Sequence, residues 1–282
     1  MSELFPPFAP DPEPRKRLFR PVPFRVIAPN LITLLGLSLG LTAIRLAFEG
    51  RVEPAILAIL AAGVLDGVDG RVARLLKGTS RFGAELDSLS DFVCFGVAPA
   101  LILYSFVLFN LRGVGWIAAL VFAIAAGLRL ARFNVMIDDP TRPEWTKNFF
   151  VGMSAPAAAV CALLPIYLHF LGVPMGAAAA PLVLVYVLGL AFMMVSTIPT
   201  FSGKTMSTRV PRHWVLPIFV VTVAFIGLLV SYPFAVLSIG TVLYLASIPF
   251  GVAWYRRLRR EDRPAPPEIP SEGSAPPPAP GP

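Results

Sequence analysis

The chain has 282 residues, of which 56% are hydrophobic and only 15% are charged. A soluble domain of this length carries about 25% charged residues, and the apolar residues here come in long uninterrupted runs. The composition therefore favours an all-α polytopic membrane protein. The formal net charge of +7 does not indicate a nucleic-acid partner, because the basic residues cluster at the ends of the apolar runs, where anionic lipid headgroups lie.

The apolar runs predict about eight transmembrane helices. In chain order these spans cover residues 31–49, 54–77, 84–108, 114–135, 150–171, 175–196, 214–231 and 233–254. Only Ser231 and Tyr232 separate the last two spans, so Pro233 predicts a tight hairpin between them. Seven spans are the alternative, and they would leave the two ends of the chain on opposite sides of the membrane.

The positions of the basic residues test this order of spans. If the N-terminus is cytoplasmic, all of the 24 lysines and arginines fall on the cytoplasmic side except Arg45, Arg51 and Arg112. So strong a bias predicts that both termini are cytoplasmic. The expected location of the protein is a bacterial inner membrane. We expect a cytoplasmic segment at 1–28 with a basic juxtamembrane stretch, and a transmembrane domain at 29–255.

From Pro264 onward the sequence is too rich in proline and too poor in large apolar residues to fold, so a disordered cytoplasmic tail is expected at 256–282. A ligand for a proline-binding domain is the alternative for this tail.

Four aspartates lie inside the second and third predicted spans, where an ionised carboxylate is costly and indicates a polar function. Asp66 and Asp69 are three residues apart, and Asp87 and Asp91 are four residues apart, so each pair shares one face of its helix. On neighbouring antiparallel helices the four carboxylates would surround one point. The spacing therefore predicts a cation site near the cytoplasmic ends of these two spans.

Residues around the aspartates indicate which ligand accompanies the cation. Gly70 removes a side chain one turn beyond Asp66, and Arg74 lies on the same face, where its guanidinium can hold a phosphate. Carboxylates beside such an arginine suit Mg²⁺ or Mn²⁺, and two of these ions can polarise a pyrophosphate. One carboxylate could also act as a general base. The alternative is a structural ion network with Arg71, Arg74 and Arg81.

The stretch from Asp66 to Asp91 resembles the signature of the CDP-alcohol phosphotransferases, D-x-x-D-G-x-x-A-R, eight residues, then G-x-x-x-D-x-x-x-D. It is matched at Asp66, Asp69, Gly70, Ala73, Arg74, Gly83, Asp87 and Asp91. The resemblance implies a six-helix core and a lipid-synthesising enzyme that displaces CMP from a CDP-linked donor.

The same resemblance implies individual roles for residues of the site. The four aspartates would bind two divalent metals, and Asp91 would also be the catalytic base. The donor, CDP-diacylglycerol, would be contacted by Gly70, Arg74 and Ser80. The P-N-x-x-T element, which is Pro29, Asn30, Leu31, Ile32 and Thr33 here, would lie near the nucleotide.

Further segments resemble the phosphatidylserine synthase branch of the family, namely residues 82–100, 127–135 and 150–159. This resemblance implies L-serine as the acceptor alcohol and membrane lipids as partners. Arg129, Arg132 and Asn134 are the candidate serine-binding residues, because arginine holds a carboxylate bidentately. The alternative for both arginines is that they are ordinary anchors at the cytoplasmic end of the fourth span.

Other functions stay open on the sequence alone. Glycerol 3-phosphate, inositol or choline could replace serine as the acceptor within the same family. A cation transporter with intramembrane carboxylates is an alternative from another class, although it gives Gly70, Arg74 and Gly83 no role. A homodimer is possible, because small residues in the spans permit close contacts between helices.

Overall fold

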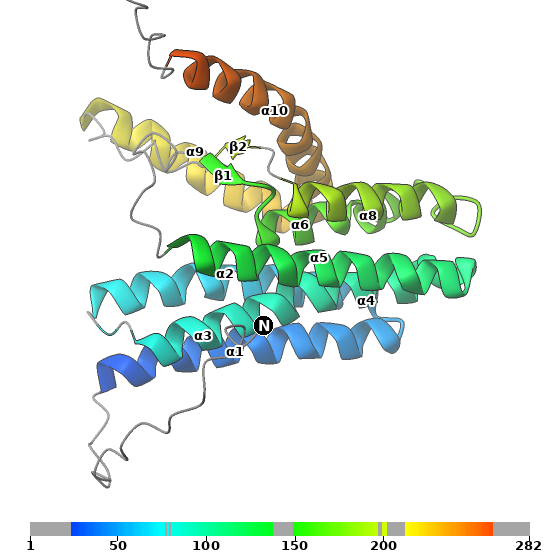
Figure 1. Ribbon diagram of the computed structural model, residues 1–282, viewed down its shortest axis with the longest axis horizontal. Helices are drawn as coiled ribbons and strands as arrows, with labels where there is room; N and C mark the ends of the chain where they lie inside the picture. Colours follow the sequence, from blue (N-terminus) through cyan, green and yellow to red (C-terminus); the bar gives the residue numbers. More distant parts are fainter. Residues whose placement is uncertain are drawn as a thin grey trace, which may run out of the picture.

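The computed structural model describes residues 24–76, 78, 80–137, 149–196, 199–201 and 212–261, and it is built almost entirely from helices (Figure 1). Its helices are α1 (Phe24–Phe48), α2 (Val52–Leu75), α3 (Arg81–Asp91), the π-helix η1 (Phe92–Val97), α4 (Ala98–Phe106), the 3-10 helix η2 (Leu108–Leu111), α5 (Gly113–Ile137), α6 (Ala155–Ala162), α7 (Leu164–Phe170), α8 (Ala180–Val195), α9 (Arg212–Ser231) and α10 (Pro233–Glu261). The predicted all-α fold is confirmed. Residues 1–23 and 262–282 of the predicted terminal segments lie outside the described residues, whereas residues 24–28 belong to α1 and residues 256–261 belong to α10.

One short sheet interrupts the helices. The strands β1 (Phe149–Val151) and β2 (Pro199–Phe201) pair antiparallel, with Phe150 opposite Thr200. The sequence did not predict this ladder, because three-residue strands carry too little alternation of polar and apolar residues to be recognised. The ladder ties the residues before α6 to those after α8.

The predicted span at residues 150–171 is wrong in its start and in its continuity. The helical structure begins at Ala155, after β1, and it breaks at Leu163 between α6 and α7. Pro165 explains the break, because proline has no amide hydrogen for the preceding turn and its ring crowds that turn. The predicted span at 175–196 likewise begins later, at Ala180.

Five continuous helical segments are long and apolar enough to cross a membrane: 27–48, 81–106, 113–135, 214–231 and 233–252. The second of these is formed by α3, η1 and α4 together. Two shorter apolar segments, 155–170 and 180–195, also belong to the bundle. Helix α2 makes its most extensive contacts with α1, but Asp66 and Asp69 interrupt its apolar run. The bundle therefore has the character of a polytopic membrane protein, and eight spans remain a prediction.

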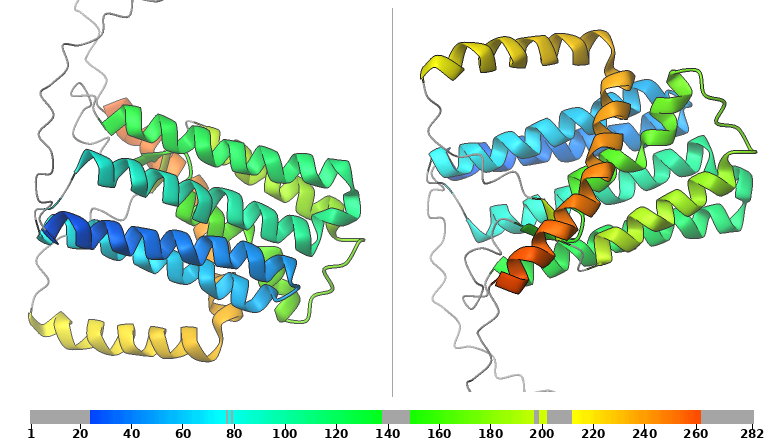
Figure 2. Two further views of the ribbon diagram at one scale, coloured as in Figure 1. Left: turned by 90° about the horizontal axis from the view of Figure 1, so that it is seen from below. Right: turned by 90° about the horizontal axis from the view of Figure 1, so that it is seen from above.

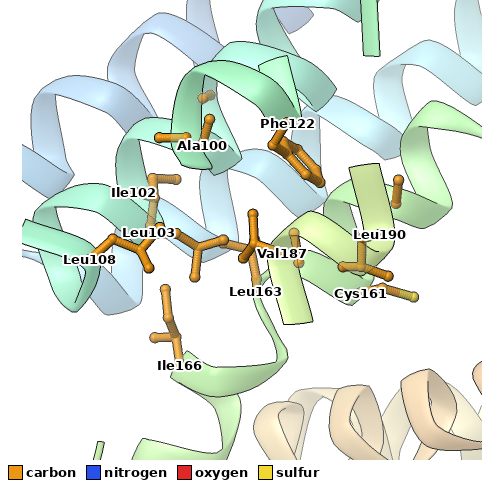
Figure 3. Close-up of a cluster of buried hydrophobic side chains, with 14 of the residues drawn as sticks. Ala100, Ile102, Leu103, Leu108, Phe122, Cys161, Leu163, Ile166, Val187 and Leu190 are labelled. Carbon is orange, nitrogen blue, oxygen red and sulfur yellow. The ribbon is translucent and has the colours of Figure 1, made fainter. Parts of the chain in front are cut away.

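The core lies between α4, α5, α6, α7 and α8. In Figure 3, Ile102 and Leu103 of α4 point toward the same interior region as Val187 and Leu190 of α8. Phe122 of α5 is also fully buried in this cluster. Ala43 of α1 and Ile56 of α2 also belong to this core, whereas α3 packs against α1 and η1.

The last two helices are arranged differently from the others. Helix α9 contacts α10 and stands apart from the central bundle, and nearly all its side chains from residue 214 onward are exposed. Helix α10 crosses the bundle obliquely and contacts α6 and α7 (Figure 2). The apolar surface of α9 suits a lipid environment, because no protein element in the described structure covers it.

Candidate metal and nucleotide site

Four carboxylates from α2 and α3 lie together near the end of the bundle where α2 ends and α3 begins (Figure 1). Carboxylate oxygens of Asp66, Asp69 and Asp87 lie within 4.8 Å of one another. Asp91 faces Asp66 within hydrogen-bonding range, and all four line one small cavity. The structure thus brings together the residues that the helical spacing predicted to converge.

The first helix holds one of these carboxylates in place. The Thr33 hydroxyl of α1 donates a hydrogen bond of 2.6 Å to Oδ2 of Asp69, and both residues are buried. The Ser90 hydroxyl of α3 lies 3.4 Å from the Thr33 backbone oxygen and donates to it. Three helices therefore fix the geometry of the carboxylate cluster, and Thr33 contacts a carboxylate directly.

No arginine in the described part of the chain forms a salt bridge with these carboxylates. Among the described residues the only salt bridges join Glu49 to Arg45 and to Arg51, at the other end of α1 and α2. The structural ion network considered as an alternative is therefore absent from the described part of the chain. Carboxylates this close together need either protons or a cation, and a set of oxygen ligands suits a hard divalent ion.

A larger cavity, of about 240 Å³, adjoins the carboxylates. Its lining contains most of the predicted donor-binding residues: Pro29, Asn30, Thr33, Gly70, Arg74 and Ser80. Asp69 and Asp87 line it as well, so a molecule in the cavity would lie against the cluster. Leu31 and Ile32 do not line this cavity, and Leu31 is 55% exposed on the outer side of α1.

Gly78 and Ala84 also line the cavity. Neither a glycine in a turn nor an alanine in a helix carries a chemical signal that would assign it to a ligand. Their place in the lining is known only from the structure.

Gly83 and Gly70 of the motif are needed for different structural reasons. A Cβ atom on Gly83 would lie 2.8 Å from Asn30 Oδ1 and 3.1 Å from Ser80 Oγ, so only glycine permits this close approach of α1 and α3. Ser80 caps α3 by accepting a hydrogen bond of 3.0 Å from the Gly83 amide. A Cβ on Gly70 would meet nothing within 4 Å, so the missing side chain leaves the cavity open.

Arg74 lines the same cavity, and its Nε donates a hydrogen bond of 2.9 Å to the Gly70 carbonyl. This contact orients the guanidinium along the wall of the cavity. A planar guanidinium in that position suits a phosphate group.

Arg129 of α5 lies near Asp91 of the cluster and does not line the cavity of about 240 Å³. It is only 7% exposed, its Nε has no hydrogen-bond partner, and its guanidinium lies 5.4 Å from the centre of the Phe133 ring. It is close enough to Asp91 for the two charges to interact. A buried guanidinium with an unpartnered N–H beside the cluster suits an anionic ligand group.

The other two predicted acceptor residues have protein partners. Arg132 donates hydrogen bonds of 2.6, 3.0 and 3.1 Å to the carbonyls of Val195, Met194 and Ser196, so it caps the C-terminal end of α8. Asn134 donates a bond of 3.0 Å to the Ser88 hydroxyl on α3. Acceptor binding by Arg132 and Asn134 therefore stays a prediction, and their observed contacts are structural.

The sequence pattern that defines the CDP-alcohol phosphatidyltransferases matches residues 26–198, which hold the whole site. The chain belongs to this family. A second pattern, described as CDP-alcohol phosphatidyltransferase 2, matches residues 213–249 in α9 and α10. Membership of a family of membrane enzymes, together with the apolar helices, makes the protein an integral membrane transferase.

Relatives in three bacteria are all named CDP-diacylglycerol–serine O-phosphatidyltransferase. The Mycobacterium leprae protein is 41% identical over 231 residues, which are 80% of this chain and 74% of the relative. The Helicobacter pylori protein is 37% identical over 77% of this chain and 87% of the relative. The Bacillus subtilis protein is 36% identical over 66% of this chain and 97% of the relative.

Proposed function

We propose that this protein is a CDP-diacylglycerol–serine O-phosphatidyltransferase, which makes phosphatidylserine and releases CMP. The relatives described above have this name, and their sequence similarity to this chain extends over most of its length. The main observation in support of the proposal is that three features lie next to one another. They are the carboxylate cluster, the cavity lined by residues of the family motif, and the buried Arg129 beside the cluster.

The proposed cofactors are two divalent metal ions, Mg²⁺ or Mn²⁺, held by Asp66, Asp69, Asp87 and Asp91. Their oxygens fit this role because they are close together and form no salt bridge within the described structure. Bound metal would neutralise the diphosphate of the donor and polarise it toward displacement. Thr33 keeps Asp69 in its orientation through the 2.6 Å hydrogen bond.

The donor's nucleotide and diphosphate would occupy the cavity of about 240 Å³. Arg74 would bind phosphate oxygens from the cavity wall, and Ser80 and Asn30 offer hydrogen-bonding groups at its rim. Gly70 leaves room for the phosphates to approach α2 closely. The diacylglycerol part would extend from the site into the lipid.

L-Serine would approach from the side of Arg129, whose guanidinium would bind the serine carboxylate. Asp91 would take the proton of the serine hydroxyl as general base. The serine oxygen then bonds to the β-phosphorus of CDP-diacylglycerol, and the bond from that phosphorus to the CMP oxygen breaks. The products are phosphatidylserine and CMP, with the proton initially on Asp91.

We also propose that the site faces the cytoplasm of a bacterial cell, that both termini are cytoplasmic, and that the protein lies in the inner membrane. The basic residues of the sequence support this orientation, because Arg71 and Arg74 lie near the end of α2 and Arg81 lies at the start of α3. Labelling of single cysteines introduced near residues 50 and 78 tests it. A reagent that cannot cross the membrane should modify only the position near residue 50 in intact cells.

A homodimer is a further proposal, supported only by the small residues of the spans. Mass photometry in detergent tests it, and a mass equal to one chain at all concentrations would refute it.

An acceptor panel tests the function. Purified protein, CDP-diacylglycerol and Mn²⁺ or Mg²⁺ are incubated with L-serine, glycerol 3-phosphate, inositol or choline, and CMP is measured. We expect CMP release with L-serine and a loss of about 100-fold or more in Asp91→Asn. Glu85→Gln is the matched control, since Glu85 is exposed on the same helix. Release with another alcohol but not with serine would overturn serine as the acceptor, and cation flux without CMP release would indicate a transporter.

A further inference from the structure

A second cavity, of about 420 Å³, lies between α2, η1, α6 and α10. Its volume falls in the range of cavities that take small molecules, and its lining is almost wholly apolar. Phe95 of η1 lines both this cavity and the small carboxylate cavity, so its ring forms the boundary between them. We call this space the α2–α10 cavity.

One end of the α2–α10 cavity lies at the level of the carboxylates. Gly63 lines the cavity and precedes Asp66 by about one helical turn. On the opposite wall, Tyr244 of α10 lines the cavity and lies within electrostatic range of Arg129, which itself lies within range of Asp91. A molecule whose head is at the aspartates could therefore extend into this cavity.

The other side of the cavity opens toward the outside of the bundle. Val64 of α2 and Gly240 of α10 both line the cavity and are exposed. Gly240 lies within the apolar segment 233–252, which is long enough to cross a membrane. An apolar chain could thus enter from the membrane without crossing water.

One polar group in the lining has no partner. Thr241 of α10 is 3% exposed, and its Oγ1 makes no hydrogen bond. Such a hydroxyl favours a ligand that brings an acceptor into an apolar space. In a diacyl lipid, the only acceptors below the headgroup are the ester oxygens.

We propose that the α2–α10 cavity receives an acyl chain of CDP-diacylglycerol and that Thr241 donates a hydrogen bond to the ester carbonyl of that chain. The inference rests on the proposed function and adds the part of the site that α10 supplies. The α10 residues that line the cavity fall in the second matched segment, 213–249, and they add one wall of the lipid site to the helices that hold the aspartates.

Filling the mouth of the cavity tests the acyl chain. A Cβ on Gly240 would meet nothing within 4 Å, so Gly240→Leu fits the helix and fills the opening. The matched control is Gly227→Leu on α9, which also has open space around a Cβ atom. Dissociation constants are measured by titration calorimetry with CDP-dioleoylglycerol and CDP-dihexanoylglycerol.

We expect Gly240→Leu to weaken binding of the dioleoyl lipid by about 10-fold and to leave binding of the dihexanoyl lipid within about 2-fold. Gly227→Leu should change neither constant. Equal effects of Gly240→Leu on both lipids, or no effect on either, would overturn the role of the cavity.

A second pair of variants tests the hydrogen bond. Thr241→Val keeps the shape of the side chain and removes the hydroxyl, whereas Thr241→Ser keeps the hydroxyl. We expect Thr241→Val to weaken binding of the diacyl lipid by about 5-fold and to leave its dialkyl ether analogue unchanged, because the ether lacks the carbonyl. Thr241→Ser should bind both as the unsubstituted protein does. Equal losses for ester and ether would overturn the assigned hydrogen bond.

These binding measurements separate the two proposals. If the protein binds CDP-dioleoylglycerol with the expected effect of Gly240→Leu but releases no CMP with L-serine, the serine transferase proposal fails and the cavity proposal stands. If CMP is released normally and Gly240→Leu has no effect on either lipid, only the cavity proposal fails. If neither lipid binds, both proposals fail.

Discussion

The hydrogen bond from Thr33 to Asp69 gives the sharpest prediction about the metal site. Thr33→Val removes the hydroxyl that donates to Asp69 Oδ2 at 2.6 Å and keeps the shape of the side chain. Both residues are buried, and the substitution leaves Asp69 Oδ2 without this protein donor. Asp69 then loses the contact that fixes its orientation toward Asp66 and Asp87.

The size of the effect follows from the kind of bond. A hydrogen bond to a charged group contributes about 1.5–3 kcal/mol, which corresponds to about 10-fold to 150-fold in an equilibrium constant. Groups that orient metal ligands have effects of about 10-fold to 100-fold on metal affinity. We therefore expect the Mn²⁺ concentration for half-maximal CMP release to rise by about 10-fold to 100-fold in Thr33→Val. Much of the activity should return at saturating Mn²⁺.

Two controls and a direct measurement make this prediction specific. Thr33→Ser retains the donor and should keep the Mn²⁺ dependence within a few-fold. Thr42→Val removes a hydroxyl from the same helix whose partner is the Ser38 carbonyl, so it should have no effect. Mn²⁺ binding is followed by electron paramagnetic resonance without substrate. An unchanged Mn²⁺ affinity in Thr33→Val, by both measurements, would refute the proposed metal-ligand role of Asp69.

Four further substitutions test other parts of the site. Because the Arg132 guanidinium caps α8, Arg132→Ala should lower the melting temperature by several degrees and leave the KM for serine almost unchanged. A large rise in the KM for serine with an unchanged melting temperature would instead indicate that Arg132 binds the acceptor. Arg129→Gln should raise the KM for serine by about 10-fold or more and leave the KM for CDP-diacylglycerol unchanged, as steady-state kinetics will measure. Gly83→Ala should lower kcat/KM by about 10-fold, because the added Cβ atom would lie too close to the Asn30 side chain. Gly70→Ala should leave the stability of the protein unchanged and mainly raise the KM for CDP-diacylglycerol, because its Cβ atom would meet no protein atom within 4 Å.

The sequence predicted the all-α fold and the convergence of the aspartates because both follow from local periodicity. Long apolar runs specify helices of membrane length, and spacings of three and four residues place Asp66 with Asp69 and Asp87 with Asp91. Local rules also failed where tertiary structure decides. Pro165 breaks the predicted fifth span, and the β1–β2 ladder joins residues far apart in the chain.

The two arginines of α5 show why residue roles were harder to predict than residue positions. Arg129 and Arg132 are three residues apart and were expected to act together on the acceptor. A separation of three residues turns the second side chain by about 60° around the helix. That rotation suffices for Arg129 to lie beside Asp91 while Arg132 reaches the carbonyls of α8. Only the position of α8, which no local pattern encodes, distinguishes the two.

Helix α2 explains how one site could handle a lipid that is charged at one end and apolar at the other. Its residues from Asp66 to Arg74 line the carboxylate cluster and the nucleotide cavity, while Ile59 to Val64 line the α2–α10 cavity. The rise of 1.5 Å per residue places Ile59 about 22 Å deeper than Arg74. Polarity along this helix therefore follows the polarity of an extended CDP-diacylglycerol molecule. A substrate aligned with α2 would keep its diphosphate at the carboxylates and its acyl chain in the membrane interior. The charged diphosphate would then stay out of the lipid, and the apolar acyl chain would stay out of water.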